Sequence, residues 1–189
     1  MDFRLRGNDR LNYGLKFWEE GDTTSYNMEN VERRLKYLAI LRHGDDKDGV
    51  LTALGRDQYR DLGGRLKQFM NRGDEAMVFT SVSQRAQDSS RFLAGALKAP
   101  VVIRRILLTG NDYSPRPDVA YELVESVQNS FDFVALVTHY ELTEHFPEYC
   151  ARGFNFPRTA YFNIGKGEGV LLDIRAQSAL KLEQTNYKS

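Results

Sequence analysis

The amino-acid sequence predicts an α/β protein, a three-layer sandwich with a mostly parallel central sheet and helices on both faces. Three apolar runs, at 36–43, 76–81 and 131–139, have the length of strands buried on both sides. Helical patterns separate them, and alternation of strand and helix is typical of a parallel sheet with covered faces. The length of 189 residues suits one domain with a sizeable core.

The first predicted helix covers 51–73, with Thr52 as its N-cap and Gly73 at its end. Gly63 and Gly64 lie inside it, and each costs about 1 kcal/mol relative to alanine in a helix interior. We therefore expect this helix to pack closely against the sheet. Its apolar stripe is formed by Leu54, Leu62, Leu66 and Phe69.

Four further elements follow towards the C-terminus. A helix is predicted over 84–97, a strand over 101–106 and a helix over 118–128. Two strands, 158–165 and 169–175, flank the segment GKGEG, which we interpret as the turn of an antiparallel hairpin at the sheet edge rather than a phosphate-binding loop.

Residues 1–35 are predicted to form an N-terminal arm, and residues 36–189 the domain itself. The arm has no clean hydrophobic period, and a short helix is expected near 30–34. Its aromatic residues favour packing on the body as a cover for a sheet edge over a roof above the site. They are Tyr13, Phe17, Trp18 and Tyr26.

Composition narrows the function classes. The 26 basic and 26 acidic side chains give a formal net charge of +0, which disfavours a nucleic-acid partner. No apolar run is long enough to span a bilayer, and the first residues lack the apolar stretch of a secretory signal. The single cysteine, Cys150, excludes an internal disulfide and suggests a packed thiol in a reducing compartment. We therefore expect a cytoplasmic protein with neither a nucleic-acid nor a membrane partner.

Polar side chains that can bind an anion follow three of the apolar strands. Arg42 and His43 end the first, Ser81 and Arg85 follow the second, and His139 ends the third. In open parallel sheets, ligands bind outside the carboxyl ends of the strands. We expect these side chains to converge on one site.

Two arginines and two histidines around one centre favour phosphoryl transfer. A guanidinium group holds phosphate oxygens through two parallel hydrogen bonds. His43 can attack phosphorus and carry the group covalently, and flanking positive charge should lower its pKa and keep it neutral. The nearby arginines repel a cation, so no metal or other cofactor is expected, although Asp45 and Asp46 beside the histidines could imitate a metal site.

Four segments carry a family pattern in order: a strand ending in Arg-His-Gly, a Leu-Thr-x-x-Gly-x-x-Gln helix, a Ser-x-x-x-Arg-Ala-Gln segment and a later histidine at a strand end. These are LRHG at 41–44, then 51–58, 81–87 and VTH at 137–139. The chain thereby resembles the histidine phosphatase superfamily, also called phosphoglycerate-mutase-like.

The resemblance implies a phosphoglycerate-mutase-like fold and a phosphorylated substrate. It implies that His43 is the nucleophile that becomes phosphorylated. Arg42, Arg85 and His139 would bind the phosphoryl group, with Ser81 beside them as a further substrate-binding residue. Two departures from the pattern, Val82 for proline and Asp88 for threonine, do not touch this chemistry; these substitutions are visible in the sequence TSVSQRAQDSS.

The interval from Arg85 to His139 holds only a helix, a strand, a helix and a strand. Mutases and sugar bisphosphatases of the family carry a large insertion there, so the short interval resembles the SixA-type phosphohistidine phosphatases. An open site that accepts a phosphohistidine protein or a small phosphoester is therefore expected. A phosphomutase is disfavoured, and a non-catalytic phosphate-binding module is the alternative from another class.

A phosphoester substrate would need a general acid to protonate its leaving group. The sequence offers several carboxylates for that role without favouring one of them. The third histidine, His145, is expected to be a surface residue. The candidate acids are Glu141, Glu122, Asp112 and Asp45.

Overall fold

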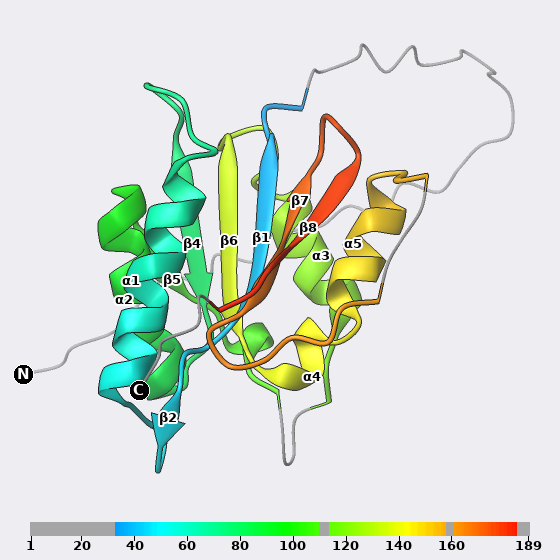
Figure 1. Cartoon of the computed structure of the whole chain (residues 1–189). Coiled ribbons are helices and arrows are strands. Elements are labelled where there is room, and N and C mark those ends of the chain that lie inside the picture. The colour runs from blue at the N-terminus through cyan, green and yellow to red at the C-terminus, as the bar shows by residue number, and fades with distance from the viewer. Residues whose placement is uncertain (1–32, 110–113, 158–160, 185–189) are drawn as a thin grey trace, which may run out of the picture. The chain divides into compact units, whose positions relative to one another are not determined.

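The computed structural model describes residues 33–109, 114–157 and 161–184, which belong to one structural unit. Its centre is a six-stranded sheet in the order β5-β4-β6-β1-β7-β8 (Figure 1). The first four of these pair in parallel. They are β5 (Val101–Ile103), β4 (Ala76–Thr80), β6 (Phe133–Thr138) and β1 (Tyr37–Arg42).

The antiparallel edge differs from the sequence-based expectation. The strands β7 (Gly169–Asp173) and β8 (Ser178–Leu182) form the hairpin, and β7 pairs with β1. Residues 161–165 are not a strand, and 158–160 lie outside the described residues. The prediction of a hairpin turn at GKGEG is therefore wrong. The physical reason is that β8, which follows β7 in the chain, pairs with the edge of β7 that the predicted strand before GKGEG would have taken.

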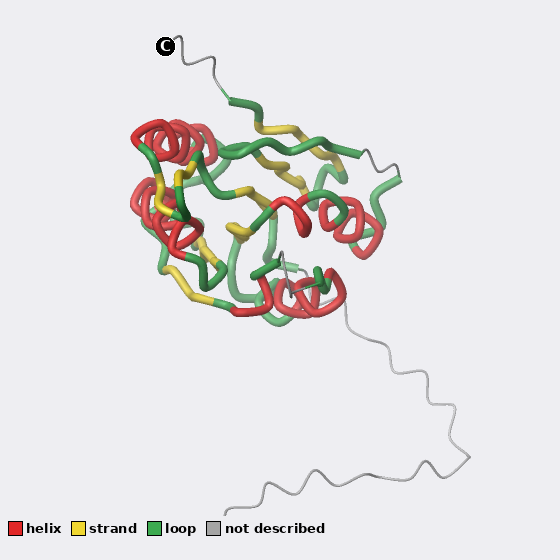
Figure 2. The backbone as a smooth tube through the Cα atoms, turned by 90° about the horizontal axis from the view of Figure 1, so that it is seen from below, coloured by secondary structure: helices red, strands yellow, loops and turns green. Residues whose placement is uncertain are grey.

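Helices cover both faces of the sheet, which confirms the predicted sandwich. Figure 2 shows the strands between two sets of helices. On one face, α1 (Ala53–Lys67) and α2 (Gln84–Leu97) bury one apolar cluster. The other face buries a second cluster beneath the remaining α-helices. These are α3 (Pro117–Glu125), α4 (Tyr140–Thr143) and α5 (Phe146–Gly153).

The first helix begins where the sequence predicts and ends earlier. Thr52 is its N-cap, because the Oγ1 of Thr52 accepts a hydrogen bond of 3.1 Å from the backbone N–H of Gly55. After Lys67 the backbone tightens into i to i−3 hydrogen bonds, which stop the helix before Gly73. Leu54, placed on the apolar stripe by the sequence, is 43% exposed.

Two short strands that the sequence did not predict, β2 (Asp46–Lys47) and β3 (Val50–Leu51), form a small hairpin between His43 and α1. Asp48 and Gly49 turn it with positive φ angles of 51° and 79°. A strand predicted to reach 106 ends at Ile103 and continues as the 3-10 helix η1 (Arg105–Leu107).

Most of the predicted arm lies outside the described residues. Its last three residues are described, and Arg33 and Arg34 are not helical, contrary to the short helix expected there. Arg34 instead bridges Asp132 at 2.9 Å, which draws the backbone out towards the loop before β6. Leu35 is fully buried, and its N–H donates to the carbonyl of Gln128. In the described part of the chain, no helix is both long and apolar enough to cross a membrane.

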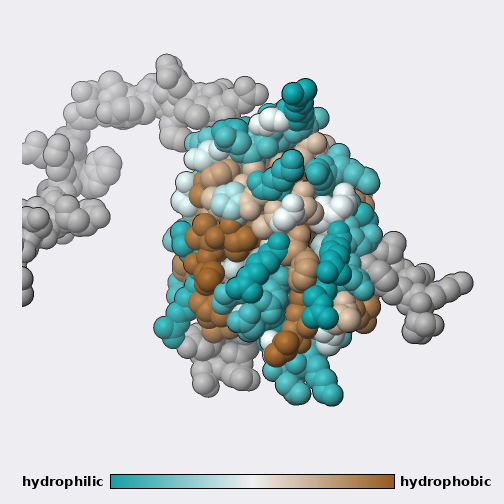
Figure 3. All heavy atoms as spheres, turned by 90° about the vertical axis from the view of Figure 1, so that its left-hand side faces the viewer, coloured by the Kyte–Doolittle hydropathy of each residue, from teal (hydrophilic) through white to brown (hydrophobic). Residues whose placement is uncertain are grey.

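The sheet edge at β5 is exposed. Figure 3 shows one side of the molecule, where apolar side chains gather in patches among polar ones. On β5, Val101 and Ile103 are 37% and 48% exposed. The strand has only three residues, and the exposed Arg104 follows it; a short strand next to a charge is a common protection against edge pairing.

The two glycines of α1 have different surroundings. A Cβ added to Gly63 would lie 2.7 Å from the Cβ of Ala96 on α2, whereas one added to Gly64 would meet nothing within 4 Å. The expectation that the sheet packs against these glycines is therefore corrected: α2 is the partner at Gly63, and Gly64 has no close neighbour among the described residues.

This difference predicts opposite effects of one substitution. Gly64→Ala should raise the free energy of unfolding by up to about 1 kcal/mol, because alanine favours the helix. In Gly63→Ala, overpacking against α2 should outweigh the helix preference of alanine and lower the free energy of unfolding by about 1 kcal/mol or more. Urea unfolding followed by circular dichroism measures both, and equal effects would contradict the close approach of α1 and α2.

Candidate active site

Two histidines meet at the carboxyl edge of the sheet, as the sequence predicts. The parallel register sets Arg42 opposite Thr138, so His43 and His139 are the next residues on neighbouring strands. The N–H of His43 donates to the carbonyl of Thr138 at 3.0 Å, and the ring centroids lie 5.2 Å apart. Ser81 follows β4 at the same edge, with its N–H bonded to the carbonyl of Val137.

The environment of His43 fixes its protonation and its tautomer. The Nδ1 atom lies 2.9 Å from the carbonyl oxygen of Gly44. Because a carbonyl only accepts, Nδ1 carries the hydrogen and Nε2 keeps a lone pair. Burial, followed by the charges of Arg85 and Arg42, lowers the pKa of His43 to about 4, despite the bond to Gly44. The ring is therefore neutral at pH 7, with a nucleophilic Nε2.

His139 has the opposite tautomer, with its hydrogen on Nε2. The guanidinium of Arg85 can only donate, and its Nη2 lies 3.4 Å from Nδ1 of His139. The Nε2–H therefore donates to the hydroxyl of Ser81 at 2.8 Å. Burial, then His43 and Arg85, lowers the pKa of His139 to about 4. Ser81, expected to bind substrate, orients this ring.

Both arginines retain unused hydrogen-bond donors. Arg42 donates from Nη1 to the carbonyl of Ile164 at 3.2 Å and lies over the ring of Tyr140 at 5.1 Å. Arg85, in the first turn of α2, reaches Asp46 only at 3.5 Å. The buried Nε atoms of Arg42 and Arg85 have no hydrogen-bond partner among the described residues. Unsatisfied donors on two guanidiniums whose charges both act on His43 are suited to binding an oxyanion.

The loop after His43 is held by residues of the motif helix. Gln58 accepts from the N–H of Asp45 at 2.8 Å, and Tyr59 donates to the carbonyl of Arg42 at 2.8 Å. A Cβ on Gly55 would lie 2.2 Å from the carbonyl oxygen of Asp45, so only glycine allows this approach. The Leu-Thr-x-x-Gly-x-x-Gln motif therefore acts through the backbone of the loop that carries His43.

Sequence reasoning missed Lys166 at this site, and it considered Asp46 only as part of an apparent metal site. The Asp46 side chain is 8% exposed and contacts Nζ of Lys166 at 2.8 Å. Lys166 belongs to GKGEG, which runs beside the end of β1: the N–H of Gly167 donates to the carbonyl of His43 at 2.9 Å. A lysine flanked by glycines was a sequence signal for a loop near a bound phosphate. Its position close to His43 could not be predicted, because it depends on the tertiary structure.

No family model matches this chain, and no curated protein matches it. Several solved structures do. A protein histidine phosphatase SixA complexed with tungstate aligns with a TM-score of 0.58 and 18% identity, over 79% of this chain and 96% of the other. The putative phosphohistidine phosphatase SixA from Agrobacterium tumefaciens aligns at 0.51 and 14%, over 80% and 97%. A putative alpha-ribazole-5'-P phosphatase from Escherichia coli aligns at 0.55 and 18%, over 80% and 97%.

The chain has the histidine phosphatase fold. This confirms the fold that the sequence resemblance implied, and the likeness extends to structures described as SixA. At identities of 14–18%, the likeness concerns the fold, and the site has to be argued from its own residues.

Within this histidine phosphatase fold, the four candidate acids lie in different places. Glu141 accepts from the hydroxyl of Thr109 at 2.8 Å. Burial alone would raise the pKa of Glu141, but hydrogen bonds from its own N–H and from Thr109 outweigh burial and lower it. Asp45 accepts from Thr52 at 2.7 Å. Glu122 is exposed on α3, and Asp112 lies outside the described residues.

Other chemistry-bearing side chains lie away from the site. His145 is exposed, as expected, and Cys150 is a free, fully buried thiol whose pKa is raised by burial. Among the described residues, no group of three or more histidine, cysteine, aspartate or glutamate side chains could hold a metal ion.

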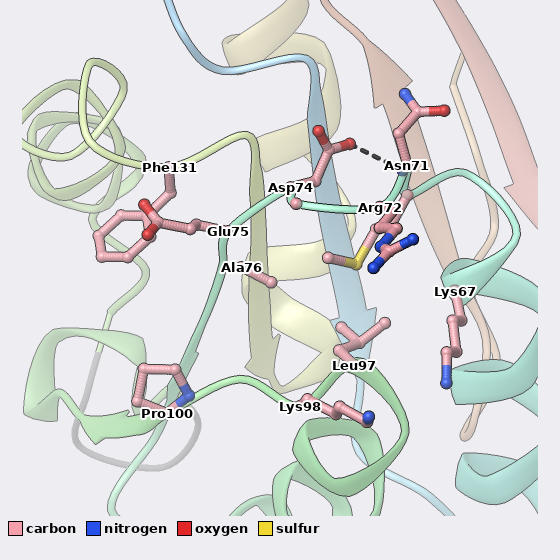
Figure 4. A pocket seen from close by; sticks show the side chains of 12 residues that line it. Lys67, Asn71, Arg72, Asp74, Glu75, Ala76, Leu97, Lys98, Pro100 and Phe131 are labelled. Atoms are coloured by element: carbon pink, nitrogen blue, oxygen red, sulfur yellow. Dashed lines mark hydrogen bonds between the residues drawn. The ribbon is translucent and has the colours of Figure 1, made fainter.

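A cavity of about 650 Å³ lies at the opposite end of the sheet, where β4 begins at Ala76 (Figure 4). Its acids are paired within the protein: Asp74 with Lys36 at 2.6 Å and Glu75 with Arg34 at 2.8 Å. The histidines are at the carboxyl end of the strands, so this cavity is separate from the candidate active site.

The lowered pKa values of the two histidines predict a dependence of stability on pH. Both pKa values, about 4, lie below the value of 6.5 for a free imidazole, so between these limits the unfolded state binds more protons. The stability contribution should be complete above about pH 6.5 and be lost as pH falls towards 4, on the order of a few kcal/mol for the pair.

Urea unfolding at several pH values checks this slope. His145→Gln should leave it unchanged, because His145 is exposed. The double variant His43→Asn, His139→Asn should reduce it. An unchanged slope in the double variant would mean that the two rings are not the groups responsible.

Proposed function

We propose that the protein is a phosphatase that transfers a phosphoryl group to Nε2 of His43 and then to water. The observation that carries this proposal is the pairing of a neutral His43, whose Nε2 keeps a lone pair, with buried Nε donors on Arg42 and Arg85 that have no described partner. The first is what a nucleophile needs, and the second is what a phosphoryl group needs.

The reaction has two steps. The lone pair of His43 Nε2 forms a bond to phosphorus, and the bond to the leaving group breaks with its electron pair going to that group. The ring gains positive charge while its Nδ1–H still donates to Gly44. Arg42 and Arg85 offset the negative charge on the phosphoryl oxygens. A water molecule then attacks phosphorus, the N–P electron pair returns to Nε2, and the water proton leaves with the phosphate or passes to solvent.

The substrate class we favour is phosphohistidine on a protein. Glu141 lies two residues after His139, which makes it a candidate general acid. Its lowered pKa, however, leaves it ionised at neutral pH, so it is a poor proton donor. Phosphoryl transfer between two imidazoles exchanges similar groups and needs little acid help. The SixA structures of similar fold are described as a putative phosphohistidine phosphatase and a protein histidine phosphatase, which supports this choice. Small phosphoesters with good leaving groups are the second class.

The nucleophile is tested by replacement. His43→Ala should lower the turnover of an aryl phosphate by at least about 10³-fold, because the nitrogen that takes the phosphoryl group covalently is removed. His145→Ala is the matched control and should keep wild-type turnover. Tight phosphate binding by a wild type with no turnover of aryl phosphate, phosphohistidine protein or sugar phosphates would instead support the non-catalytic module.

The leaving-group argument is tested by acid variants. Glu141→Gln and Asp45→Asn should each keep phosphohistidine hydrolysis within about tenfold of wild type, because an imidazole leaving group does not depend on a general acid. Release of phosphate from a phosphohistidine protein measures this. Two results together would instead support an ester phosphatase. The wild type would turn over alkyl phosphates faster than phosphohistidine, and one acid variant would lose that alkyl phosphate turnover.

A further inference from the structure

The buried carboxylate of Asp46 lies among three basic side chains that come from three separate segments. Its Oδ1 is 2.8 Å from Nζ of Lys166 and 3.6 Å from Nδ1 of His43. Its Oδ2 is 3.5 Å from Nη1 of Arg85. Asp46 thus touches both the expected nucleophile and one of the expected phosphate ligands without being part of either motif.

The loop that carries Lys166 is built rigidly against the site. The N–H of Gly165 donates to the carboxylate of Glu168 at 2.7 Å, and Arg42 donates from its N–H to the carbonyl of Glu168 at 3.0 Å. Gly167 has a φ of +72°, and a Cβ there would lie 2.6 Å from Oε1 of Gln58. Lys166 is therefore presented to Asp46 by a fixed backbone.

We propose that Asp46, held by Lys166, is a positioning residue that orients the His43 ring and the Arg85 guanidinium and balances the charge the ring gains during phosphoryl transfer. This proposal rests on the function proposed above. The carboxylate faces the Nδ1 side of His43, so it stays clear of the Nε2 that would attack phosphorus. Lys166 compensates its negative charge, which would otherwise repel the incoming phosphate.

The electrostatics of the cluster agree with this arrangement. Burial alone would raise the pKa of Asp46, but the hydrogen bond from Lys166 and the charges of His43, Lys166 and Arg85 outweigh burial and lower it. Asp46 is therefore ionised at neutral pH. Its charge favours a positive His43 ring, while Arg85 and Arg42 oppose one.

The proposal predicts that binding and transfer respond in opposite directions. In Asp46→Asn, inorganic phosphate should bind about threefold to tenfold more tightly, because a negative charge next to Arg85 is gone. Phosphorylation of His43 in a single turnover with an aryl phosphate should become about tenfold to hundredfold slower, because the ring loses its counter-charge. Asp46→Glu keeps the charge and should restore part of the rate.

Lys166→Met should act with the opposite sign on binding, weakening phosphate about threefold to tenfold, because the carboxylate of Asp46 is then uncompensated. The pKa of His43, followed by NMR of the ring, should fall in Asp46→Asn and rise in Lys166→Met. Asp48→Asn and Lys47→Met, both at exposed positions of the same small hairpin, are the matched controls and should change neither quantity.

Phosphate binding and the NMR titration need no turnover, so they separate this proposal from the proposed function. If both follow the expected signs while wild type forms no phosphohistidine, the charge coupling of Asp46 to His43 and to bound phosphate stands and the phosphatase does not. If Asp46→Asn weakens phosphate binding and slows transfer alike, or changes neither, Asp46 is only a structural residue and the proposal is overturned.

Discussion

The parallel pairing of β1 with β6 is the constraint on which the rest of the site depends. Its register makes His43 and His139 the first residues beyond two adjacent strands, of which β6 is buried throughout and β1 along its four central residues. His43 is held by bonds from its backbone N–H to Thr138 and from its Nδ1 to Gly44, and the His139 ring is held by the hydroxyl of Ser81. Every other group at the site, whether Arg85 from α2 or Lys166 from the loop before β7, is placed relative to these two rings.

Burial decides the chemistry of the pair more than charge does. Desolvation is the largest cause of the lowered pKa of both histidines, and the neighbouring arginines add to it. The fold thus keeps two neutral imidazoles at an edge where guanidinium donors remain unsatisfied. Such a combination attracts an oxyanion and leaves an uncharged nitrogen free to attack it.

The GKGEG segment shows how a backbone can serve a site without belonging to a motif. It contributes Lys166 to Asp46 and the N–H of Gly167 to the carbonyl of His43. In the same way, α1 holds the loop after His43 through the side chains of Gln58 and Tyr59. The charged cluster around Asp46 is therefore set by three segments that are distant in the chain.

The sequence by itself determined the sheet, the helices on both faces and the meeting of His43 with His139, because these follow from hydrophobic period and from polar residues at strand ends. It determined α2 to the residue, Gln84–Leu97. It could not place Gly63 against Ala96, β7 beside β1, or Lys166 beside Asp46. Those contacts join segments that are far apart in the chain. A local sequence pattern does not indicate which distant strand pairs with a sheet edge or which lysine neutralises a buried carboxylate. Only tertiary packing decides these contacts.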